Sequence, residues 1–407
     1  MFYRKFNELN LSQLGMGLMR LPKIEGKGEA IDEGKAQAII EQAYENGVNY
    51  FDTAYRYHGG ESERFAGRTL SQYKRDSFYL ASKMPGHMMN YENGNYSFTG
   101  LLAKSPPRTP SEVFEEQLER CRVDYFDFYL LHNVSEGSYG FYTNEEIGVI
   151  PFLLEQMKKG RIRHLGFSAH GRPETIEKFI LWSESRFPGG CFEIVQIQLN
   201  YLDWALQDAK RKYEILTDHK IRVIAMEPCR GGKLASFDDK AGENLNDLLK
   251  ASRPNDSIAS WAFRFAKALP NMQVFLSGMS SLEQLHDNLK TFSDSVVLTE
   301  EENKILQKVV AALANLIPCT ACRYCSAECP QKLDIPKLIS MHNAAANGDE
   351  SIWGALGFTL NTMTEAELPS SCVDCGNCIQ VCPQGIDVPD IMRKLAEGIS
   401  NNVKPKL

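Results

Sequence analysis

Eight of the eleven cysteines in this 407-residue chain form two identical patterns near its C-terminal end. Each pattern reads C-x2-C-x2-C-x3-C-P. The quartets are Cys319, Cys322, Cys325 and Cys329, and Cys372, Cys375, Cys378 and Cys382. Thiolates at this spacing can surround one face of a [4Fe–4S] cube. The pattern therefore predicts two [4Fe–4S] clusters.

The spacing resembles the cysteine runs of bacterial two-cluster ferredoxins, in which the fourth cysteine of each run binds the other cluster. The resemblance implies an exchange between the quartets. Cys382 would complete the cluster held by the first three cysteines of the first quartet, and Cys329 would complete the other. The quartets lie 43 residues apart (372 − 329). This length leaves room for helices, so we expect a small, mostly helical ferredoxin-like domain.

Zinc and disulfide bonds are the alternatives for these cysteines. Structural zinc sites usually use separated pairs of ligands, which these strict triplets followed by Cys-Pro fit poorly. Disulfide bonds are disfavoured because the first residues, MFYRKFNELN, lack the apolar segment of a secretory signal. We therefore expect a cytoplasmic protein, in which the thiols stay reduced.

A second set of chemically active residues follows hydrophobic segments earlier in the chain. Asp52 ends one segment, and Tyr57 comes five residues later. Lys83 ends FYLASK, and His132 ends FDFYLLH. If these segments are neighbouring strands of a barrel, the four side chains gather at the edge where barrels build active sites. The alternative is that they are buried polar groups with a structural role only.

The elements that must position these residues alternate between β-rich and helical patterns over residues 1–316, as in βα units around a parallel sheet. Eight strands of this kind predict a (β/α)8 TIM barrel of the α/β class, followed by the ferredoxin-like domain over 317–407. The strands are expected at 14–18, 48–52, 78–82, 126–131, 164–167, 194–198, 222–225 and 274–276. A doubly wound sheet is the alternative, but no G-x-G-x-x-G opens a helix after any of these strands.

The first 300 residues resemble the aldo/keto reductase family. The resemblance rests on RKFNELNLSQLGMGLMRLP, GRIRHLGFSAHG, IVQIQLNYLD and VIAMEPCRGGKLA, and on the segments of Asp52, Tyr57, Lys83 and His132 in this order. It implies an oxidoreductase that reduces a carbonyl, or oxidises an alcohol, with NAD(P)(H). The added ferredoxin-like domain is similar to an iron–sulfur branch of that family.

The resemblance gives each of the four residues a role. Tyr57, rather than its neighbour Tyr55, would be the general acid, although a phenol with a pKa near 10 needs help at neutral pH. Lys83 would lower that pKa, and Asp52 would hold Lys83 as an ion pair. His132 would orient the carbonyl group of the substrate.

Cofactor contacts are also implied by the resemblance. Ser168 and Gln196 would contact the nicotinamide carboxamide, and the segment 228–234 would pass over the pyrophosphate. The full set of expected contacts is Ser168, Gln196, Met226, Pro228, Arg230, Gly231, Lys233, Ser277, Gly278, Gln284 and Asn288. An ordinary surface loop is the alternative for 228–234.

Three departures from the family pattern concern this cofactor site. Met226 stands where an aromatic residue usually stacks on the nicotinamide, and Ala169 replaces the usual asparagine. Gly278 and Gln284 stand where lysine and arginine usually bind the 2′-phosphate. Each lost charge-assisted contact removes about 1.5–3 kcal/mol of preference for NADP. We therefore expect little or no discrimination in favour of NADPH.

A hydride cofactor and one-electron clusters in one chain raise a question of electron flow. Nicotinamide delivers two electrons together, so a flavin or an external one-electron donor or acceptor protein would have to link the two. The alternatives to a carbonyl reductase are a flavin- or cluster-dependent reductase of a non-carbonyl substrate and an electron carrier with a silent barrel. A purely structural role for the clusters is a further alternative.

Composition limits the other partners. The formal net charge is −7, which disfavours binding to nucleic acids and to anionic membranes. No apolar segment is long enough to span a bilayer. The resemblance implies a small-molecule carbonyl or alcohol substrate, and its identity cannot be read from the long segments 85–110 and 133–148 that follow two of the strands.

Overall fold

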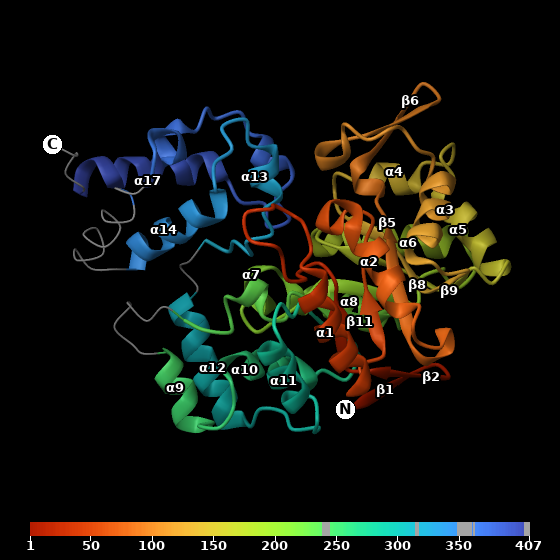
Figure 1. The fold of residues 1–407 in the computed structure, drawn as a ribbon, viewed down its shortest axis with the longest axis horizontal. Coiled ribbons are helices and arrows are strands. Elements are labelled where there is room, and N and C mark those ends of the chain that lie inside the picture. The colour runs from red at the N-terminus through yellow and green to blue at the C-terminus, as the bar shows by residue number, and fades with distance from the viewer. Residues whose placement is uncertain (238–244, 314–316, 348–359, 361–362, 403–407) are drawn as a thin grey trace. The chain divides into compact units, whose positions relative to one another are not determined.

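The computed structural model describes residues 1–237, 245–313, 317–347, 360 and 363–402 (Figure 1). The chain divides into two compact units. The first contains Met1–Cys229 and Ala259–Thr299, and the second contains Arg230–Ile258 and Glu300–Leu407. The second unit thus includes residues that the sequence analysis assigned to the barrel domain, and the boundary after residue 316 stays a prediction.

A closed barrel of eight parallel strands forms the first unit, in the order β10-β11-β12-β3-β4-β5-β8-β9. Its strands are β3 (Leu14–Gly17), β4 (Tyr50–Asp52), β5 (Tyr79–Met84), β8 (Phe126–Val134), β9 (Ile162–Ala169), β10 (Ile194–Gln198), β11 (Arg222–Met226) and β12 (Met272–Ser277). All eight predicted strands are present, and the predicted (β/α)8 barrel is confirmed. The doubly wound sheet is excluded because β9 pairs with β10 and closes the ring.

Alternation along the strands separates an inner from an outer face, because successive side chains of a strand point to opposite sides. One buried cluster contains Tyr50, Ala81, Phe128 and Leu130, which share one face of their strands. The same cluster contains Ile194, Ile224, Val274 and Leu276, together with Phe6 and Leu11. Such a layer of side chains fills the interior of a small barrel.

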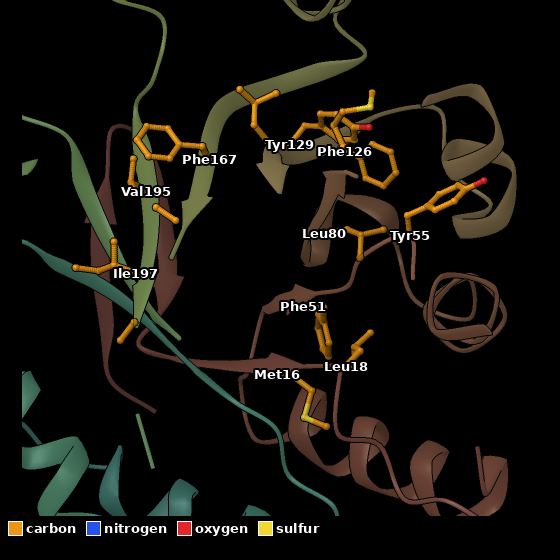
Figure 2. Packing of buried hydrophobic residues seen from close by; sticks show 14 of the residues in the cluster. Met16, Leu18, Phe51, Tyr55, Leu80, Phe126, Tyr129, Phe167, Val195 and Ile197 are labelled. Atoms are coloured by element: carbon orange, nitrogen blue, oxygen red, sulfur yellow. The ribbon is translucent and has the colours of Figure 1, made fainter. Parts of the chain in front are cut away.

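The outer face of the strands packs against helices. Figure 2 shows Phe51, Leu80, Tyr129, Phe167 and Val195 of the large buried cluster that fills this layer. The helices outside the barrel strands are α1 (Glu33–Glu45), α2 (Glu61–Leu70), α3 (Pro110–Cys121), α5 (Val149–Lys158), α6 (Pro173–Arg186), α7 (Asp203–Leu206), α8 (Ala209–Asp218), α10 (Ile258–Lys267) and α11 (Leu282–Thr291). Helix α3 begins with a complete capping box at Thr109, which fixes its first turn.

Two hairpins were not predicted. The first, β1 (Tyr3–Phe6) with β2 (Leu9–Ser12), supplies Phe6 and Leu11 to the inner cluster. The second, β6 (Met89–Glu92) with β7 (Asn95–Phe98), lies in the long segment after β5. Its turn residues Asn93 and Gly94 both have positive φ, as a tight type I′ turn requires.

The second unit is mostly helical, as expected for the ferredoxin-like part. Its described α-helices are α9 (Leu245–Ser252), α12 (Glu300–Leu313), α13 (Tyr324–Glu328), α14 (Ile335–Asn347), α16 (Asn377–Gln380) and α17 (Val388–Asn402). Helices α14 and α17 contact each other (Figure 1). The sequence also predicts helices at 300–316 and 351–360. The first is described to Leu313, and all but Leu360 of the second lies outside the described residues.

None of the helices in the described parts of the chain is long and apolar enough to cross a membrane.

Candidate functional site

The four polar residues singled out in the sequence lie together at one end of the barrel. Asp52 ends β4, and Lys83 and His132 lie near the C-terminal ends of β5 and β8. Each follows an interior residue by two positions, namely Tyr50, Ala81 and Leu130, so the alternation of the strands points all three toward the barrel axis. Tyr57 begins the short helical turn η1 (Tyr57–Gly60) after β4.

Lys83 is the centre of this group. Its Nζ donates to Asp52 Oδ1 at 2.5 Å, to the Thr53 carbonyl oxygen at 2.9 Å and to the Tyr57 hydroxyl oxygen at 3.3 Å. An ammonium group has three donors and no acceptor, so these three oxygens satisfy it completely. The Lys83 and Asp52 side chains are 1% and 3% exposed, which makes them a buried ion pair.

The contact with Lys83 leaves the proton of Tyr57 available. Lys83 can only donate, so the Tyr57 oxygen accepts and its own O–H is not used in this contact. Tyr55 is arranged differently, because its hydroxyl donates to Glu116 at 2.8 Å. The structure thus brings Tyr57, and not Tyr55, to the lysine.

The pKa of Tyr57 differs from the expectation. Burial raises the pKa of Tyr57 well above its ordinary value, and the carboxylates of Asp52 and Glu227 add to that rise. The expected lowering by Lys83 is not found. The physical reason is that Asp52 compensates the lysine charge at short range, while the burial of Lys83 lowers the pKa of the lysine itself. Tyr57 is therefore a protonated phenol at neutral pH.

His132 is a neutral imidazole in this site. Burial lowers the pKa of His132 well below 6.5, and nearby His87, Lys83 and His170 lower it further. Its ring lies edge-on to Tyr57, with ring centres 5.9 Å apart. The backbone oxygen of His132 accepts from the Tyr142 hydroxyl at 2.7 Å, which ties the loop after β8 to the site. A neutral imidazole has one donor and one acceptor for a bound substrate.

Two of the expected nicotinamide contacts lie on neighbouring strands beside the tetrad. Ser168 of β9 and Gln196 of β10 are direct register partners. The Gln196 amide lowers the pKa of Asp52 against the larger effect of burial. Among the described residues, Gln196 Oε1 is buried without a hydrogen-bond partner. A buried carbonyl oxygen of this kind fits a carboxamide N–H group, so the residues present are compatible with a nicotinamide.

The residues at the end of β12 form a compact corner. Asn288 Nδ2 donates to Ser277 Oγ at 2.9 Å. Gln284 uses its side-chain oxygen to accept from the Ser280 backbone N–H at 2.7 Å. A Cβ atom at Gly278 would come within 2.8 Å of Arg20 Cβ. The structure therefore brings four of the expected nucleotide contacts together, with Arg20 as an additional neighbour.

The segment after β11 continues from one unit into the other. Met226 and Pro228 belong to the first unit, whereas Arg230, Gly231 and Lys233 belong to the second. Arg230 is 3% exposed, and its Nη2 donates to the Pro318 carbonyl oxygen at 3.2 Å. Gly231 has a positive φ of 65°, and the backbone N–H of Lys233 bonds to the Arg230 carbonyl. Their role in cofactor binding stays a prediction.

Sequence reasoning missed three residues of this region. His87 lies four positions after Lys83, and its ring centre is 4.5 Å from that of His132. Arg20 and Glu227 form an ion pair of 3.2 Å. The available signal was position, because His87 and Glu227 come five and two positions after the ends of predicted strands (87 − 82 and 227 − 225), where barrels carry their chemistry.

The cysteines of the second unit gather into two sets. One small cavity is lined by Cys329 together with Cys372, Cys375 and Cys378. Cys325, in turn, has Cys322, Cys319, Cys382 and Cys378 as electrostatic neighbours. Cys319 is also an electrostatic neighbour of Cys382. Cys378 also lines the cavity and so belongs with the first set. Each set then contains three cysteines of one quartet and the last cysteine of the other, a donor set that fits two cubane clusters.

The backbone around the two quartets repeats at a separation of 53 residues (372 − 319). Ala321 and Asp374 both have a φ of 54°, and Arg323 and Gly376 have φ values of 67° and 73°. Left-handed residues of this kind turn successive N–H groups toward one side and form concavities that bind anions, including iron–sulfur clusters. The Ala321 N–H already points at Cys319 Sγ, with a distance of 3.4 Å.

The thiols of Cys325 and Cys378 are weaker acids than an ordinary cysteine, because their pKa values are raised. Burial and neighbouring thiols raise the pKa of Cys325 to about 12 and the pKa of Cys378 to about 11. Thiolates, rather than thiols, are the ligands of iron, so metal binding must offset this cost. Within the described residues, no three His, Cys, Asp or Glu side chains converge on the position of one single metal ion.

Comparison with known proteins agrees with both halves of this description. The sequence pattern described as "Aldo/keto reductase family" matches residues 13–311, and the pattern "4Fe-4S dicluster domain" matches residues 318–386. The protein belongs to the aldo/keto reductase family. It is an oxidoreductase with a C-terminal iron–sulfur domain, as the sequence analysis predicted.

Individual relatives are similar over the barrel part. The chain is 27% identical over 321 residues to an uncharacterized oxidoreductase, YqkF, of Bacillus subtilis, covering 74% of this chain and 93% of that protein. It is 25% identical to L-galactose dehydrogenase of Arabidopsis thaliana, covering 76% and 93%. It is also 22% identical to an NADH-specific methylglyoxal reductase of Escherichia coli, covering 75% and 97%.

Solved structures show the same fold. The aldo-keto reductase AKR11C1 from Bacillus halodurans in its holo form superimposes with a TM-score of 0.57 at 24% identity, over 76% of this chain and 96% of that one. The thermostable aldo-keto reductase Tm1743 gives the same TM-score at 20% identity, over 76% and 100%. At these identities the likeness concerns the fold alone.

Proposed function

We propose that this protein reduces a small carbonyl compound, or oxidises the corresponding alcohol, with NAD(P)(H), and that two [4Fe–4S] clusters couple this reaction to one-electron transfer. The observation that carries the proposal is the convergence of Asp52, Tyr57, Lys83 and His132 at the C-terminal end of the barrel. The cytoplasm is the proposed location, because thiols stay reduced there.

Tyr57 is the proposed proton donor. Its hydroxyl oxygen accepts from Lys83, so its proton can be donated to the carbonyl oxygen of a bound substrate. As the proton leaves, negative charge develops on the phenol oxygen, and the Lys83 ammonium at 3.3 Å stabilises that charge. The high resting pKa of Tyr57 keeps the acid protonated until a substrate is bound.

Asp52 and His132 position the other groups. Asp52 holds the Lys83 ammonium at 2.5 Å and offsets the cost of burying it. His132 is neutral, so it can donate one hydrogen bond to the substrate oxygen and fix the orientation of the carbonyl group. In the oxidation direction Tyr57 would first lose its proton, and the phenolate, stabilised by Lys83, would accept the proton of the alcohol.

A nicotinamide bound at this site would supply the hydride, and the clusters would supply or accept single electrons. Gln196 is the proposed partner of the nicotinamide carboxamide, through its unpartnered Oε1. Met226 would contact the ring through its sulfur, a softer contact than aromatic stacking. The eight cysteines are the proposed cluster ligands, in the two mixed sets described above.

Anaerobic purification followed by iron and sulfide counts, an acid extract and titration with NADH tests this proposal. The expected result is about eight iron atoms per chain, as two [4Fe–4S] clusters require, and cluster absorption that bleaches when NADH is added. Reduction of a panel of aldehydes and ketones by NADH should be lost in Tyr57→Phe. A protein with intact clusters that neither binds a nicotinamide nor reduces any carbonyl would contradict the proposal.

A flavin-dependent reductase is the second candidate, and Met226 is the observation that favours it. The position where the family usually stacks an aromatic residue on nicotinamide carries a flexible side chain, and clusters that exchange single electrons are commonly linked to hydride chemistry by a flavin. A stoichiometric flavin in the acid extract would support this candidate. An extract without flavin, from a protein that still reduces carbonyls, would exclude it.

A further inference from the structure

The ion pair between Arg20 and Glu227 joins two segments at the active-site end of the barrel. Arg20 follows β3, and Glu227 directly follows Met226, the last residue of β11. Arg20 Nη2 lies 3.2 Å from Glu227 Oε1. The side chains are 28% and 15% exposed, so the guanidinium is neither fully buried nor freely solvated.

Glu227 is held in a strained conformation. Its φ is 54°, in the left-handed region that a residue with a side chain rarely adopts. Asn200 Nδ2 donates to the Glu227 carbonyl oxygen at 3.0 Å and holds the backbone in this state. Among the described residues, Glu227 Oε2 is buried without a hydrogen-bond partner. Strain of this kind collects at functional sites, where the surroundings fix it.

Arg20 occupies the space that a side chain at position 278 would need. A Cβ atom on Gly278 would lie 2.8 Å from Arg20 Cβ and 3.1 Å from its Cδ. Ser280 Oγ donates to the Arg20 carbonyl oxygen at 2.6 Å, which fastens the segment after β3 to the turn after β12. The glycine therefore permits the arginine stem to lie across the corner where the nucleotide contacts are expected.

The pair also lies close to the proposed proton donor. Glu227 raises the pKa of Tyr57, and Arg20 lowers it. Arg20 is thus a neighbour of both the Gly278 corner and Tyr57, near which opposite ends of a dinucleotide are expected. Arginine suits phosphate recognition there, because its planar fork can bind two oxygens at once.

We propose that Arg20 is a phosphate-binding residue of the cofactor site and that Glu227 competes with the phosphate for it. The inference rests on the proposed nicotinamide function and adds a residue to it. A phosphate that binds must take the guanidinium from a carboxylate that already holds it. Arg20 then supplies a cation at the corner where Gly278 and Gln284 supply none. Competition from Glu227 limits the affinity of Arg20 for the phosphate.

Two single substitutions test this with opposite expected signs. Arg20→Gln should weaken nucleotide binding to the anaerobic holoprotein by about threefold to tenfold, less than the loss of one full charge-assisted contact, because Glu227 already holds the guanidinium. Glu227→Gln removes the competitor and should tighten binding by about threefold to tenfold. Arg20→Lys keeps the charge without the fork and should fall between the wild type and Arg20→Gln.

NADH and NADPH are the probes, with the dissociation constant of each measured by titration calorimetry. A loss for both nucleotides in Arg20→Gln assigns the arginine to the pyrophosphate, and a loss for NADPH alone assigns it to the 2′-phosphate; both results support the proposal. Arg68→Gln is the matched control, because Arg68 forms a 2.6 Å ion pair with Glu33 on the exposed surface. Its affinities should equal those of the wild type.

Two results would overturn the inference. One is an unchanged affinity for both nucleotides in Arg20→Gln. The other is a loss in Glu227→Gln as large as that in Arg20→Gln, which would make the pair a structural clamp. Failure of the proposed function is distinguishable, because the wild-type protein would then bind neither nucleotide, and both proposals would fall together.

Discussion

The two units of this protein hold buried charge in different ways. In the barrel, Asp52 and Lys83 compensate each other at 2.5 Å, and the surrounding strands and helices form a large core of aliphatic and aromatic side chains. In the second unit the hydrophobic core is small, and three of its buried members are the quartet cysteines Cys319, Cys325 and Cys378. The barrel site can therefore exist before any cofactor binds, whereas the proposed cluster sites are expected to depend on iron.

Removal of the iron–sulfur clusters should reveal the largest difference between the two units. Metal binding supplies much of the folding free energy of small metal-binding domains. Anaerobic chelation of the iron should therefore unfold the residues that pack around the cysteines and leave the barrel folded. Limited proteolysis is the measurement, with cleavage expected within 317–407 and a protected fragment that contains all eight barrel strands, from β3 to β12. Resistance of both units after complete iron loss would mean that the cysteine region has a sufficient core of its own.

The iron content of a cysteine variant tests whether a quartet cysteine is a cluster ligand. Cys382→Ser should lower the iron content from about eight to about four atoms per chain, because one of two four-iron clusters loses a ligand. Cys121→Ser is the matched control, since Cys121 is a buried cysteine of helix α3 outside both quartets. Its iron content should stay at the wild-type value.

Tyr57→Phe should have the next largest effect, and it is confined to the barrel. Loss of a general acid usually lowers the rate by about 10²- to 10⁴-fold. We expect kcat for carbonyl reduction to fall by that factor with an unchanged iron content. Tyr55→Phe is the control, because the Tyr55 hydroxyl bonds to Glu116 instead of Lys83. A Tyr57→Phe protein with full kcat would show that another group donates the proton.

Substitution of Lys83 tests whether Asp52 and Lys83 stabilise each other in the barrel. Lys83→Met leaves the buried Asp52 carboxylate without its partner, which typically costs about 3–5 kcal/mol of unfolding free energy. The double variant Asp52→Asn/Lys83→Met should recover a large part of that loss. Denaturant unfolding of the two variants is the measurement. Equal destabilisation of the single and double variants would argue against a coupled pair.

The buried histidines predict a smaller effect that depends on pH. Burial lowers the pKa of His87 to about 4 and the pKa of His170 to about 3. An unfolded histidine has a pKa near 6.5, so below this pH the unfolded chain binds protons that the folded barrel does not. The barrel is thus fully stable above about pH 6.5 and loses stability as the pH falls toward 4.

The His87→Gln variant isolates this contribution. The decrease in its denaturation midpoint between pH 7.5 and pH 5 should be smaller than the decrease in the wild type, because one titrating group is absent. Other groups that titrate in this range are present in both proteins and cancel in the comparison. A steeper decrease in the variant would mean that His87 is protonated in the folded barrel.

The strands of the barrel could be predicted from sequence because their signal is local. Alternation places Tyr50, Ala81 and Leu130 on the inner face, and the catalytic candidates follow each of them by two residues. The β6–β7 hairpin was equally readable, since Asn93-Gly94 is a strong signal for a tight turn, but it was overlooked. Local patterns therefore account for most of the barrel.

Contacts between distant segments could not be predicted in this way. Arg20 and Glu227 are 207 positions apart, and nothing in either segment alone indicates the other. The pKa of Tyr57 is a similar case. Sequence reasoning included the lysine that would lower it, but the burial that raises it and the compensation of Lys83 by Asp52 are properties of the folded barrel.

The preference between NADH and NADPH is the smallest expected effect. It depends on two neighbouring parts of the cofactor site, the end of β12 and the Arg20–Glu227 pair. The end of β12 carries no cation at Gly278 or Gln284, and the nearby Arg20 is already paired with Glu227. A contact that must be taken from a carboxylate adds little net free energy. We therefore expect the dissociation constants of NADH and NADPH to differ by less than about tenfold, or about 1.4 kcal/mol. A preference for NADPH beyond that value would mean that the 2′-phosphate finds a stronger partner than this corner offers. Gln284→Arg, which restores one of the missing charges, should increase the preference for NADPH.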